Sequence, residues 1–534
     1  MSPPPRLRAG MDGAVLRVRA GHGWVTARAD RAATPVAVRR RNLDRVVTAL
    51  TSAGVDWFRV PARSLTHTAV AVPARDRARV VRLLAGLSAR DSGRLDVVAV
   101  RGRRSRGRAD VLRVYWPVTD PRGSLLLGAD FGCDVEFWRE HDGTLTGPRD
   151  NPIADVVAAD APVVYAAEPV FGAFASPDDT AAYRTREIFT MADPDRVTFP
   201  IDAVYTWVDG DDPDWCRRKT RALAENGWVA AASAHSANRS RFASRDELRY
   251  SLRALHCFAP WIRRVFLVTD DQVPAWLDTE YPGITVISHR DVFGGTGRLP
   301  TFNSHAIESR LHRIPGLAEH FLYLNDDVFV GRPVAPELFF TPGGLARFFR
   351  SRAAVDSAPR RPKDAPVNSA AKNNRRLIQE AFGRVLTRKM MHTPHPSRRS
   401  VIAEIEERFA GEVAATARHQ FRHPEDISLL SSLQQYYAYL TGRAAPGEIK
   451  YMYADLADPS APFKMAWVLR NRHLDAFCLN DTDADAGAAA EQEALLADFL
   501  PAYLPFVAPF ELAARGVGRQ INRSGPVPRK EMVR

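Results

Sequence analysis

Residues 321–330 hold the pattern in this chain that most strongly indicates chemistry. Four apolar residues lead into Asn325, Asp326 and Asp327, and an apolar run then resumes. This pattern predicts a buried strand that ends in two adjacent carboxylates. Two like charges at the end of a core strand are costly unless a positive group neutralises them. A divalent cation carrying a diphosphate would do so. Taken alone, the same residues also fit a solvated Asn-Asp turn between two hairpin strands.

Two further predicted strands end in acidic residues. The run 201–208 is followed by the acidic stretch 209–212, and the run 264–269 is followed by Asp270 and Asp271. Both runs are short and rich in β-branched and aromatic residues, as buried strands are. In open α/β sheets, ligands bind outside the carboxyl ends of the strands. The three acid-ended strands therefore predict one shared, metal-using anion site.

The elements that must position these residues follow an alternating pattern. Strands and helices alternate between residues 200 and 340, as βαβ units require. Ser244 and Glu247 have capping-box spacing at the start of one helix. The predicted fold class is α/β, with a mostly parallel, Rossmann-like or GT-A-like catalytic sheet covered by helices. Glycine-rich residues 294–297 could cradle phosphate or form a plain connection. Further helices are expected at about 372–391, 401–417 and 427–441.

The N-terminal third predicts a separate accessory domain. Residues 35–195 combine two amphipathic helices with short strands, which indicates an α+β domain, and they contain no catalytic motif. The other expected parts are a flexible arm at 1–34, a catalytic domain at 196–514 with a mobile excursion at 341–370, and a basic tail at 515–534.

Composition sets the broad class. The 534 residues are 45% hydrophobic and 25% charged, which is ordinary for a globular protein, and the net charge is +12. A GC-rich genome or anionic ligands could explain the excess of arginine. The four cysteines lack C-x-x-C spacing, which argues against a zinc site or a disulfide framework. No signal peptide and no long apolar run are visible, so we expect a cytoplasmic protein with peripheral contact at the inner face of the membrane.

Four residues outside the Asp-Asp motif could complete a phosphoryl-transfer site. Such chemistry needs metal ions and arginine to neutralise phosphate charge, and a base to orient the attacking hydroxyl. His395 lies between two prolines in a stiff segment, and a histidine with a pKa near neutrality can take a proton. Arg422 suits phosphate oxygens, and Asn480 and Asp481 repeat the strand-end pattern. Each also fits a plain structural role: a loop histidine, a surface arginine, and a turn or N-cap.

Long motifs in the chain resemble the Stealth family of sugar-phosphate phosphotransferases. That family includes bacterial capsule and exopolysaccharide enzymes and the animal enzyme that adds N-acetylglucosamine-1-phosphate to lysosomal glycoproteins. Residues 1–195 lie outside the resemblance and are comparable only to accessory domains of actinobacterial members. The similar stretches follow the family order: 201–210, 240–277, 299–327 with His395, 421–426 and 477–481.

The resemblance implies a nucleotide-sugar donor, expected to be UDP-linked, such as UDP-N-acetylglucosamine, and transfer of the whole sugar-1-phosphate to a hydroxyl of a glycan or glycolipid acceptor in capsular or exopolysaccharide synthesis. Asp326, Asp327 and Asp481 would bind a divalent cation, Mg²⁺ or Mn²⁺, and His395 and Arg422 would lie at the reacting phosphate. Glu247 could instead only cap its helix. The polar motif residues expected to bind substrate are Tyr205, Thr206, Trp207, Asp209, Gly210, Arg241, Asp246, Glu247, Arg249, Asn303, Glu308, Arg313 and Asn480.

Two other functions stay open at this stage. A GT-A-like glycosyltransferase would use the same donor and metal but transfer only the glycosyl group, so it would release UDP rather than UMP. A non-catalytic binder of nucleic acid or another anionic polymer would fit the net charge. The arginines are scattered, however, and no basic platform interleaved with aromatic residues is present. We therefore expect no nucleic-acid partner.

Overall fold

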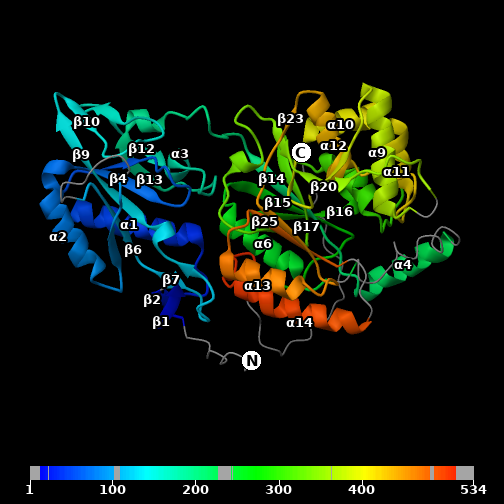
Figure 1. Cartoon of the computed structure of the whole chain (residues 1–534), viewed down its shortest axis with the longest axis horizontal. Coiled ribbons are helices and arrows are strands. Elements are labelled where there is room, and N and C mark those ends of the chain that lie inside the picture. Colours follow the sequence, from blue (N-terminus) through cyan, green and yellow to red (C-terminus); the bar gives the residue numbers. More distant parts are fainter. Residues whose placement is uncertain are drawn as a thin grey trace, which may run out of the picture.

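The structure, a computed structural model, describes residues 12–21, 23–100, 109–226, 242, 244–361, 364–481 and 486–512. Two parts lie side by side, an N-terminal part and a C-terminal part that begins with strand β14 (Figure 1). The largest hydrophobic cluster draws only on residues between Val197 and Phe510, and a separate cluster lies between Leu43 and Tyr183. Phe506 crosses from the C-terminal part to pack near Phe131 and Phe174. The domain boundary near residue 195 stays a prediction.

The N-terminal part is built from two sheets and helices, as expected for an α+β domain. Helix α1 (Pro35–Ser52) starts earlier than its amphipathic stretch, because Thr34 accepts a hydrogen bond from the Ala37 N–H and Pro35 opens the helix. Helix α2 (Arg77–Ser88) and α3 (Glu168–Phe171) complete the helices used below. The larger sheet contains β3 (Phe58–Val60), β4 (Thr68–Pro73), β5 (Arg94–Val97), β6 (Val111–Tyr115), β9 (Cys133–His141), β10 (Thr144–Thr146), β11 (Val156–Ala158), β12 (Val163–Ala167) and β13 (Ala182–Arg186).

The flexible arm predicted at residues 1–34 is wrong for its described portion. Strands β1 (Val15–Ala20) and β2 (Gly23–Ala29) form an antiparallel hairpin, and β2 pairs in parallel with β7 (Val118–Thr119). Strand β8 (Leu126–Leu127) completes this smaller sheet. Burial of alternate small side chains, including those of Ala27 and Ala29, holds the hairpin in place despite its weak periodicity. Residues 1–11 lie outside the described part of the chain, as does the expected basic tail.

A five-stranded sheet forms the centre of the C-terminal part and confirms the α/β prediction. Its order is β16-β15-β14-β17-β22, and the first four strands are parallel. Strand β14 lies in the middle of the sheet. The chain adds β15 and β16 on one side of β14 and then β17 on the other side, so the carboxyl end of β14 is a topological switch point. The bounds are β14 (Ile201–Thr206), β15 (Ile262–Thr269), β16 (Ile284–Ser288), β17 (His320–Asn325) and β22 (His395–Arg398).

Helices surround this sheet. The described α-helices of the C-terminal part are α4 (Pro213–Glu225), α6 (Glu247–Phe258), α7 (His289–Phe293), α8 (Ser304–Glu308), α9 (Pro366–Phe382), α10 (Arg399–Arg408), α11 (Ala410–Arg418), α12 (Gln434–Leu440), α13 (Ala461–Asn471) and α14 (Ala486–Tyr503). A π-helical turn, Leu429–Leu433, precedes α12. No helix in the described part of the chain is both long and apolar enough to cross a membrane.

Two predictions in the 341–391 region need correction. The expected excursion contains strands β19 (Ala346–Phe348) and β20 (Arg350–Ala354), and the first is buried beside β23 (Ala444–Pro446). The helix predicted at 372–391 ends at Phe382, because Gly383 adopts a left-handed conformation with φ of 62°. Strand β21 (Arg388–Met390) then pairs with β20.

A second, three-stranded sheet approaches the end of β17. Strand β18 (Val328–Val330) follows Asp327 directly and pairs antiparallel with β25 (Ala476–Asn480), which runs parallel to β24 (Tyr451–Asp455). The backbone N–H of Leu479 donates to the Asp327 carbonyl at 3.0 Å. This pairing brings residues from near residue 480 to the Asp-Asp motif.

Candidate active site

A cavity of about 860 Å³ opens at the carboxyl ends of β14 and β17. Its walls come from the central sheet, the three-stranded sheet and the segment between α11 and α12. It therefore lies where the topology predicts a ligand site. The sequence-predicted residues that line it are Thr206, Trp207, Glu247, Glu308, Asp326, Asp327, His395, Arg422, Asn480 and Asp481.

Three carboxylates crowd one end of the cavity. Burial is the largest cause that raises the pKa of Asp326 well above its usual range, and the nearby Asp327 and Glu247 add to it. Burial likewise raises the pKa of Glu247, against hydrogen bonds from backbone N–H groups. Among the described residues, no arginine or lysine forms an ion pair with Asp326 or Glu247. Asp326 and Glu247 are therefore crowded carboxylates without a cationic ion-pair partner among the described residues.

Asp481 brings a fourth carboxylate to the same end. Its Oδ2 accepts a hydrogen bond from Arg245 Nη2 at 2.7 Å, while its Oδ1 is buried without a partner among the described residues. Asp327 Oδ1 is likewise buried without a hydrogen-bond partner among the described residues. Oxygen atoms of this kind are the ligands that Mg²⁺ and other hard cations prefer. Asp327 and Asp481 thus each leave one carboxylate oxygen that a divalent cation could bind.

A histidine and a cysteine that sequence analysis missed also face Asp327. His392 Nδ1 lies 3.1 Å from Cys478 Sγ and 3.8 Å from Asp327 Oδ2, and Cys478 Sγ lies 3.4 Å from the same oxygen. Asn325 lies within hydrogen-bonding distance of the other nitrogen of His392, at 2.9 Å. No local spacing in the sequence could reveal this group, because its members come from three distant segments.

His395 lies in strand β22, opposite Tyr323 of β17, and its ring stacks on the tyrosine ring. Burial, with a smaller effect of His392, lowers the pKa of His395 to about 3. The expectation of a pKa near neutrality is therefore wrong for the free protein. Gln435 Nε2, which also donates to the Leu430 carbonyl, donates to His395 Nδ1 at 3.4 Å. The proton of the neutral ring then belongs on Nε2.

Arg422 lines the cavity from the loop after α11. Its Nη2 donates to Ser304 Oγ at 2.8 Å. Burial lowers the pKa of Arg422, and the charges of Glu308 and Asp426 oppose that effect. Glu308 also accepts hydrogen bonds from the Ser431 backbone and hydroxyl groups. The guanidinium is thus held in place at the cavity wall by neighbours on both sides.

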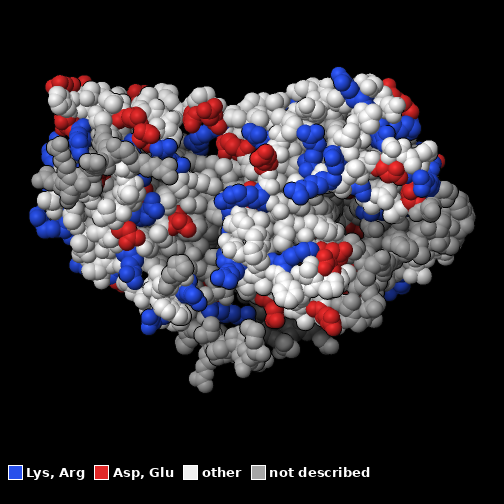
Figure 2. Space-filling view, viewed as in Figure 1, with Lys and Arg blue, Asp and Glu red and all other residues white. Residues whose placement is uncertain are grey.

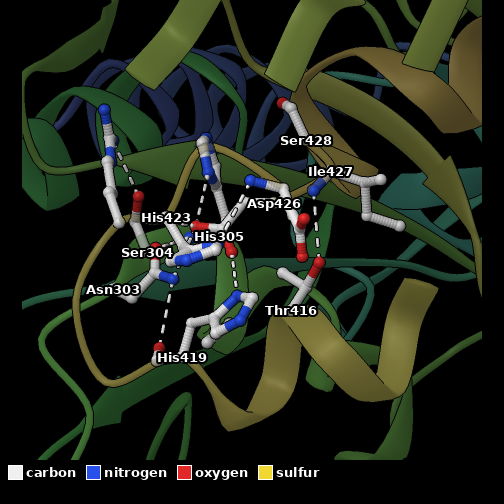
Figure 3. Close-up of polar contacts among 12 residues, drawn as sticks. Asn303, Ser304, His305, Thr416, His419, His423, Asp426, Ile427 and Ser428 are labelled. Atoms are coloured by element: carbon white, nitrogen blue, oxygen red, sulfur yellow. Dashed lines mark hydrogen bonds and ion pairs between the residues drawn. The ribbon is translucent and has the colours of Figure 1, made fainter. Parts of the chain in front are cut away.

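Asp426 organises the loop that carries Arg422. It accepts hydrogen bonds from Asn303 Nδ2 at 2.8 Å, His419 Nδ1 at 2.7 Å and the His423 N–H at 2.8 Å. His305 Nδ1 lies 3.5 Å from it. Figure 3 shows these side chains converging on the carboxylate. Burial alone would raise the pKa of Asp426, but its histidine partners outweigh burial and lower the pKa to about 2.

The Asp426 network gives the predicted residue Asn303 a structural role, and it includes a cavity residue that was not predicted, His305. Asn303 is fully buried and caps helix α8, and it does not line the cavity. His305, the second residue of the same helix, does line the cavity. His305 lies within the family-like stretch 299–327, but its contact with Asp426 could not be predicted, because the two residues are more than a hundred positions apart.

Several other predicted substrate residues have structural roles outside the cavity lining. The Tyr205 hydroxyl is buried against Ser251 Oγ at 2.9 Å. Gly210 leaves room for the Phe242 carbonyl, which a Cβ would approach to 2.3 Å. The Asp209 carboxylate accepts a hydrogen bond from the Asp211 N–H.

The remaining predicted residues stabilise helices and their connections. Asp246 is the N-cap of α6 with a positive φ, so the expected capping box at Ser244 is absent, and Glu247 instead accepts from the Arg245 N–H. Arg249 forms an ion pair with Glu511, and Arg313 forms one with Glu406. Neither arginine lines the cavity. Arg241 lies outside the described residues.

The acids after β14 and β15 do not join the cavity, which corrects the prediction of a site shared by three strands. Asp212 caps helix α4 through the Trp215 N–H, Asp270 pairs with Arg218, and Asp271 accepts from the Ser288 hydroxyl. The Gly294–Gly297 loop, which begins at the C-cap of α7, also lies outside the lining. Only β17 and β25 supply strand-end acids to the site.

Charge on the surface is mixed. Figure 2 shows lysine and arginine side chains interspersed with acidic ones over both parts of the face in view. On this face the excess positive charge does not gather into one continuous patch.

The chain is similar to known proteins over most of its length. Models of Stealth protein conserved regions 1, 2, 3 and 4 match residues 199–227, 241–348, 391–439 and 466–521. An exopolysaccharide phosphotransferase of Streptomyces coelicolor is 44% identical over 521 residues, which cover 94% of this chain and 88% of the relative. Exopolysaccharide phosphotransferase CpsY of Mycobacterium tuberculosis is 37% identical over 422 residues, 78% of this chain and 76% of the relative.

A solved structure also matches at low similarity. The crystal structure of a galactosyltransferase, LgtC, in complex with donor and acceptor sugar analogues is 14% identical, covers 56% of this chain and 96% of its own, and gives a TM-score of 0.29.

Proposed function

This chain belongs to the Stealth family, and from that membership we propose that it is a phosphotransferase of exopolysaccharide synthesis. It transfers a sugar-1-phosphate from a nucleotide-sugar donor to a hydroxyl of a glycan or glycolipid acceptor. The observation that carries the proposal is one cavity with uncompensated carboxylates at one end and a positioned arginine and two histidines elsewhere on its wall. A UDP-linked sugar such as UDP-N-acetylglucosamine is the proposed donor.

The carboxylate end would bind the donor diphosphate through a divalent cation. Asp326, Asp327 and Asp481 would hold Mg²⁺ or Mn²⁺, and the unpartnered oxygens of Asp327 and Asp481 support this assignment. The bound cation would neutralise charge on the diphosphate and on the leaving nucleotide. Thr206 and Trp207, at the end of β14, would line the nucleotide side.

Arg422 and His395 would contact the reacting phosphate. The guanidinium suits the oxygens of the transferred phosphoryl group, where charge accumulates in the transition state. Burial keeps His395 uncharged, and because Gln435 donates to its Nδ1, its Nε2–H suits donation to a phosphoryl oxygen. His395 then stabilises charge rather than accepting a proton.

His305 is the better-placed proton acceptor. Its Nδ1 lies 3.5 Å from Asp426 Oδ2 and has no hydrogen-bond partner among the described residues. If that contact shortens when substrate binds, Asp426 would orient the imidazole and leave Nε2 to accept a proton. The acceptor hydroxyl would lose its proton to Nε2, its oxygen would bond to phosphorus, and the phosphoanhydride bond would break to release a nucleoside monophosphate. Added imidazole should restore part of the turnover of His305→Ala and none of the turnover of His395→Ala. Equal rescue of both variants would contradict this division of roles.

A labelled donor tests the overall reaction. With ³²P in the sugar-proximal phosphate, the label should pass to the acceptor and the nucleotide should leave as UMP. The glycosyltransferase alternative predicts that the label leaves in UDP. Retention of label in the nucleotide would therefore overturn the proposal.

We place the reaction in the cytoplasm, with peripheral contact at the membrane. Helix α13 supports the membrane contact. Phe463, Ala466 and Trp467 are exposed on one face of it, and the exposed fractions of Phe463 and Trp467 are 78% and 48%. Arg470 lies on the same face. Aromatic and basic residues on one helix face suit the interface of anionic lipid. The protein should sediment with anionic vesicles, more than with neutral ones, and Phe463→Ser should weaken that binding. Equal sedimentation of the variant would contradict the contact.

A further inference from the structure

The group Asp327, His392 and Cys478 has a chemistry that the proposed phosphotransfer does not use. The three candidate ligand atoms come from a strand end, the loop before β22 and strand β25, and they lie within 4.8 Å of one another. Oxygen ligands alone suit Mg²⁺, whereas a thiol and an imidazole select softer cations. The group is therefore chemically distinct from the carboxylates beside it.

We propose that Asp327, His392 and Cys478 form a site for a thiophilic divalent cation such as Zn²⁺, and that its occupation inhibits the enzyme. The binding part of this proposal stands on the geometry alone. The inhibition part rests on the proposed function, because it requires Asp327 to serve the catalytic cation.

The distances match a tetrahedral zinc site. The atoms Nδ1 and Sγ, Sγ and Oδ2, and Nδ1 and Oδ2 are separated by 3.1, 3.4 and 3.8 Å. Ordinary zinc bonds of about 2.0–2.3 Å at tetrahedral angles place such ligand atoms roughly 3.4–3.6 Å apart. The three atoms can therefore occupy one face of a tetrahedron with shifts of a few tenths of an ångström. Three protein ligands leave the fourth position for water.

The surroundings favour a metal ligand at His392. Asn325 contacts its Nε2 at 2.9 Å and fixes the ring orientation. With its amide turned so that Oδ1 accepts the Nε2–H, Asn325 would hold the proton there and leave Nδ1 free for a cation. A second partner of this kind is usual for histidines that bind metals.

Metal binding would also change the state of the thiol. In the free protein Cys478 is a buried thiol whose S–H donates to Asp327 Oδ2 at 3.4 Å. A bound dication would displace that proton to solvent, forming the metal–sulfur bond as the sulfur–hydrogen bond breaks. Binding should therefore release one proton from Cys478 and strengthen as pH rises.

Inhibition follows from the shared carboxylate. Oδ2 of Asp327 would bind the soft cation, while Oδ1 is the unpartnered oxygen assigned to the catalytic one. A dication on Oδ2 would draw charge from the same carboxylate and add a like charge nearby, so Oδ1 would bind a second dication more weakly. Zn²⁺ should thus weaken activation by Mg²⁺ without entering the donor position itself. The sequence argument against zinc rested on the absence of paired cysteines, so it does not address this group, which contains one cysteine.

Titration with Co²⁺ tests binding without an activity assay. Co²⁺ added to the full chain in the presence of Mg²⁺ should produce a thiolate-to-metal charge-transfer absorption, and Zn²⁺ should remove it. Cys478→Ser, which keeps a hydroxyl donor toward Asp327, should lose the absorption. Cys216→Ser, a half-buried cysteine on α4, is the matched control and should keep it. Should Cys478→Ser fold poorly, His392→Gln removes a second ligand and should also abolish the absorption.

The inhibition assay then uses the same variants. Zn²⁺ should inhibit the wild type, and the concentration for half inhibition should rise at least about tenfold in Cys478→Ser. Absence of the absorption in the wild type, or its persistence in Cys478→Ser, would overturn the site. A cysteine-dependent absorption without inhibition would overturn the inhibitory role. Failure to transfer phosphate with any donor would count against the proposed function, while the absorption would still report the site.

Discussion

Buried carboxylates in the two parts of the molecule have opposite surroundings. In the N-terminal part, Glu168 contacts Arg39 at 2.6 Å and Arg59 at 2.8 Å. Burial alone would raise the pKa of Glu168, but the two guanidinium groups outweigh it and lower the pKa. In the cavity, Asp326 and Glu247 form no ion pair with a described residue, and burial raises the pKa of both.

The difference separates stabilising charge from functional charge. A buried carboxylate between two arginines is compensated by the fold itself, so removing it leaves unpaired cations behind. A cluster of crowded carboxylates lowers stability unless protonation or a bound cation relieves the repulsion. The cavity carboxylates are therefore expected to govern activity, and the N-terminal carboxylates are expected to govern stability.

The largest effect should come from Asp327→Ala. Turnover should fall about 10⁴-fold, which corresponds to a barrier higher by ~5.5 kcal/mol, because the proposed cation loses a carboxylate ligand of the Asp-Asp motif. The melting temperature should stay equal or rise, because a like charge leaves a crowded site. Steady-state kinetics and thermal unfolding measure both. Near-normal turnover, or full wild-type activity in excess EDTA, would remove the cation from the mechanism.

The opposite pattern is expected for Glu168→Gln. The free energy of unfolding should fall by about 3–5 kcal/mol, because two buried arginines lose their counter-charge. Turnover per folded molecule should not change. Urea unfolding followed by activity at low urea measures the two effects separately. Glu140→Gln, which breaks an exposed pair with Arg75, is the control and should cost about 1 kcal/mol or less. A loss of turnover without a loss of stability would place the N-terminal part in the reaction.

The cavity carboxylates were far easier to predict from the sequence than the surroundings of Glu168. The strand before Asp326 and Asp327 has an apolar run that is readable without tertiary information, and the parallel sheet follows from the alternation around it. Strand β22 was missed, because His395 and Pro396 give a short edge strand the appearance of a loop. The partners of Glu168 could not be found, because Arg39 and Arg59 are over a hundred residues away and neither lies in a motif.

Distance along the chain explains the other gaps in the site. The contacts of Asp327 with Cys478 and of His305 with Asp426 each join segments more than a hundred residues apart. The family resemblance supplied His395 and Arg422, but it could not say that burial depresses the pKa of His395. Residues that share a motif, such as Arg313, turned out to stabilise helices instead. Motifs thus located the cavity, and only packing could assign roles within it.

A smaller effect should follow from Arg422→Lys, which keeps the charge but loses the planar donor fork. The kcat value should fall about 100-fold with little change in donor KM, because the guanidinium is proposed to stabilise charge that grows in the transition state. Arg418→Lys, on the exposed face of the preceding helix α11, is the control and should be neutral. An unchanged kcat with weaker donor binding would move Arg422 from the reacting phosphate to ground-state binding.

The smallest effect is the pH dependence of stability, where the two regions should differ in sign. The raised pKa of Asp326 contributes stability that is fully present below the unfolded pKa and lost as pH rises through the folded pKa. Asp326→Asn removes this titration, so its melting temperature should gain on the wild type as pH rises above about 4 in metal-free buffer. Glu168 has a lowered pKa, so the penalty of Glu168→Gln should be complete above about pH 5 and shrink as pH falls. Melting curves of the three proteins from acid to neutral pH measure the divergence.

Added Mg²⁺ should cancel the gain of Asp326→Asn, because the cation stabilises the ionised wild-type cluster, and it should leave Glu168→Gln unchanged. Parallel curves for the wild type and Asp326→Asn would mean that the cavity carboxylates are compensated after all.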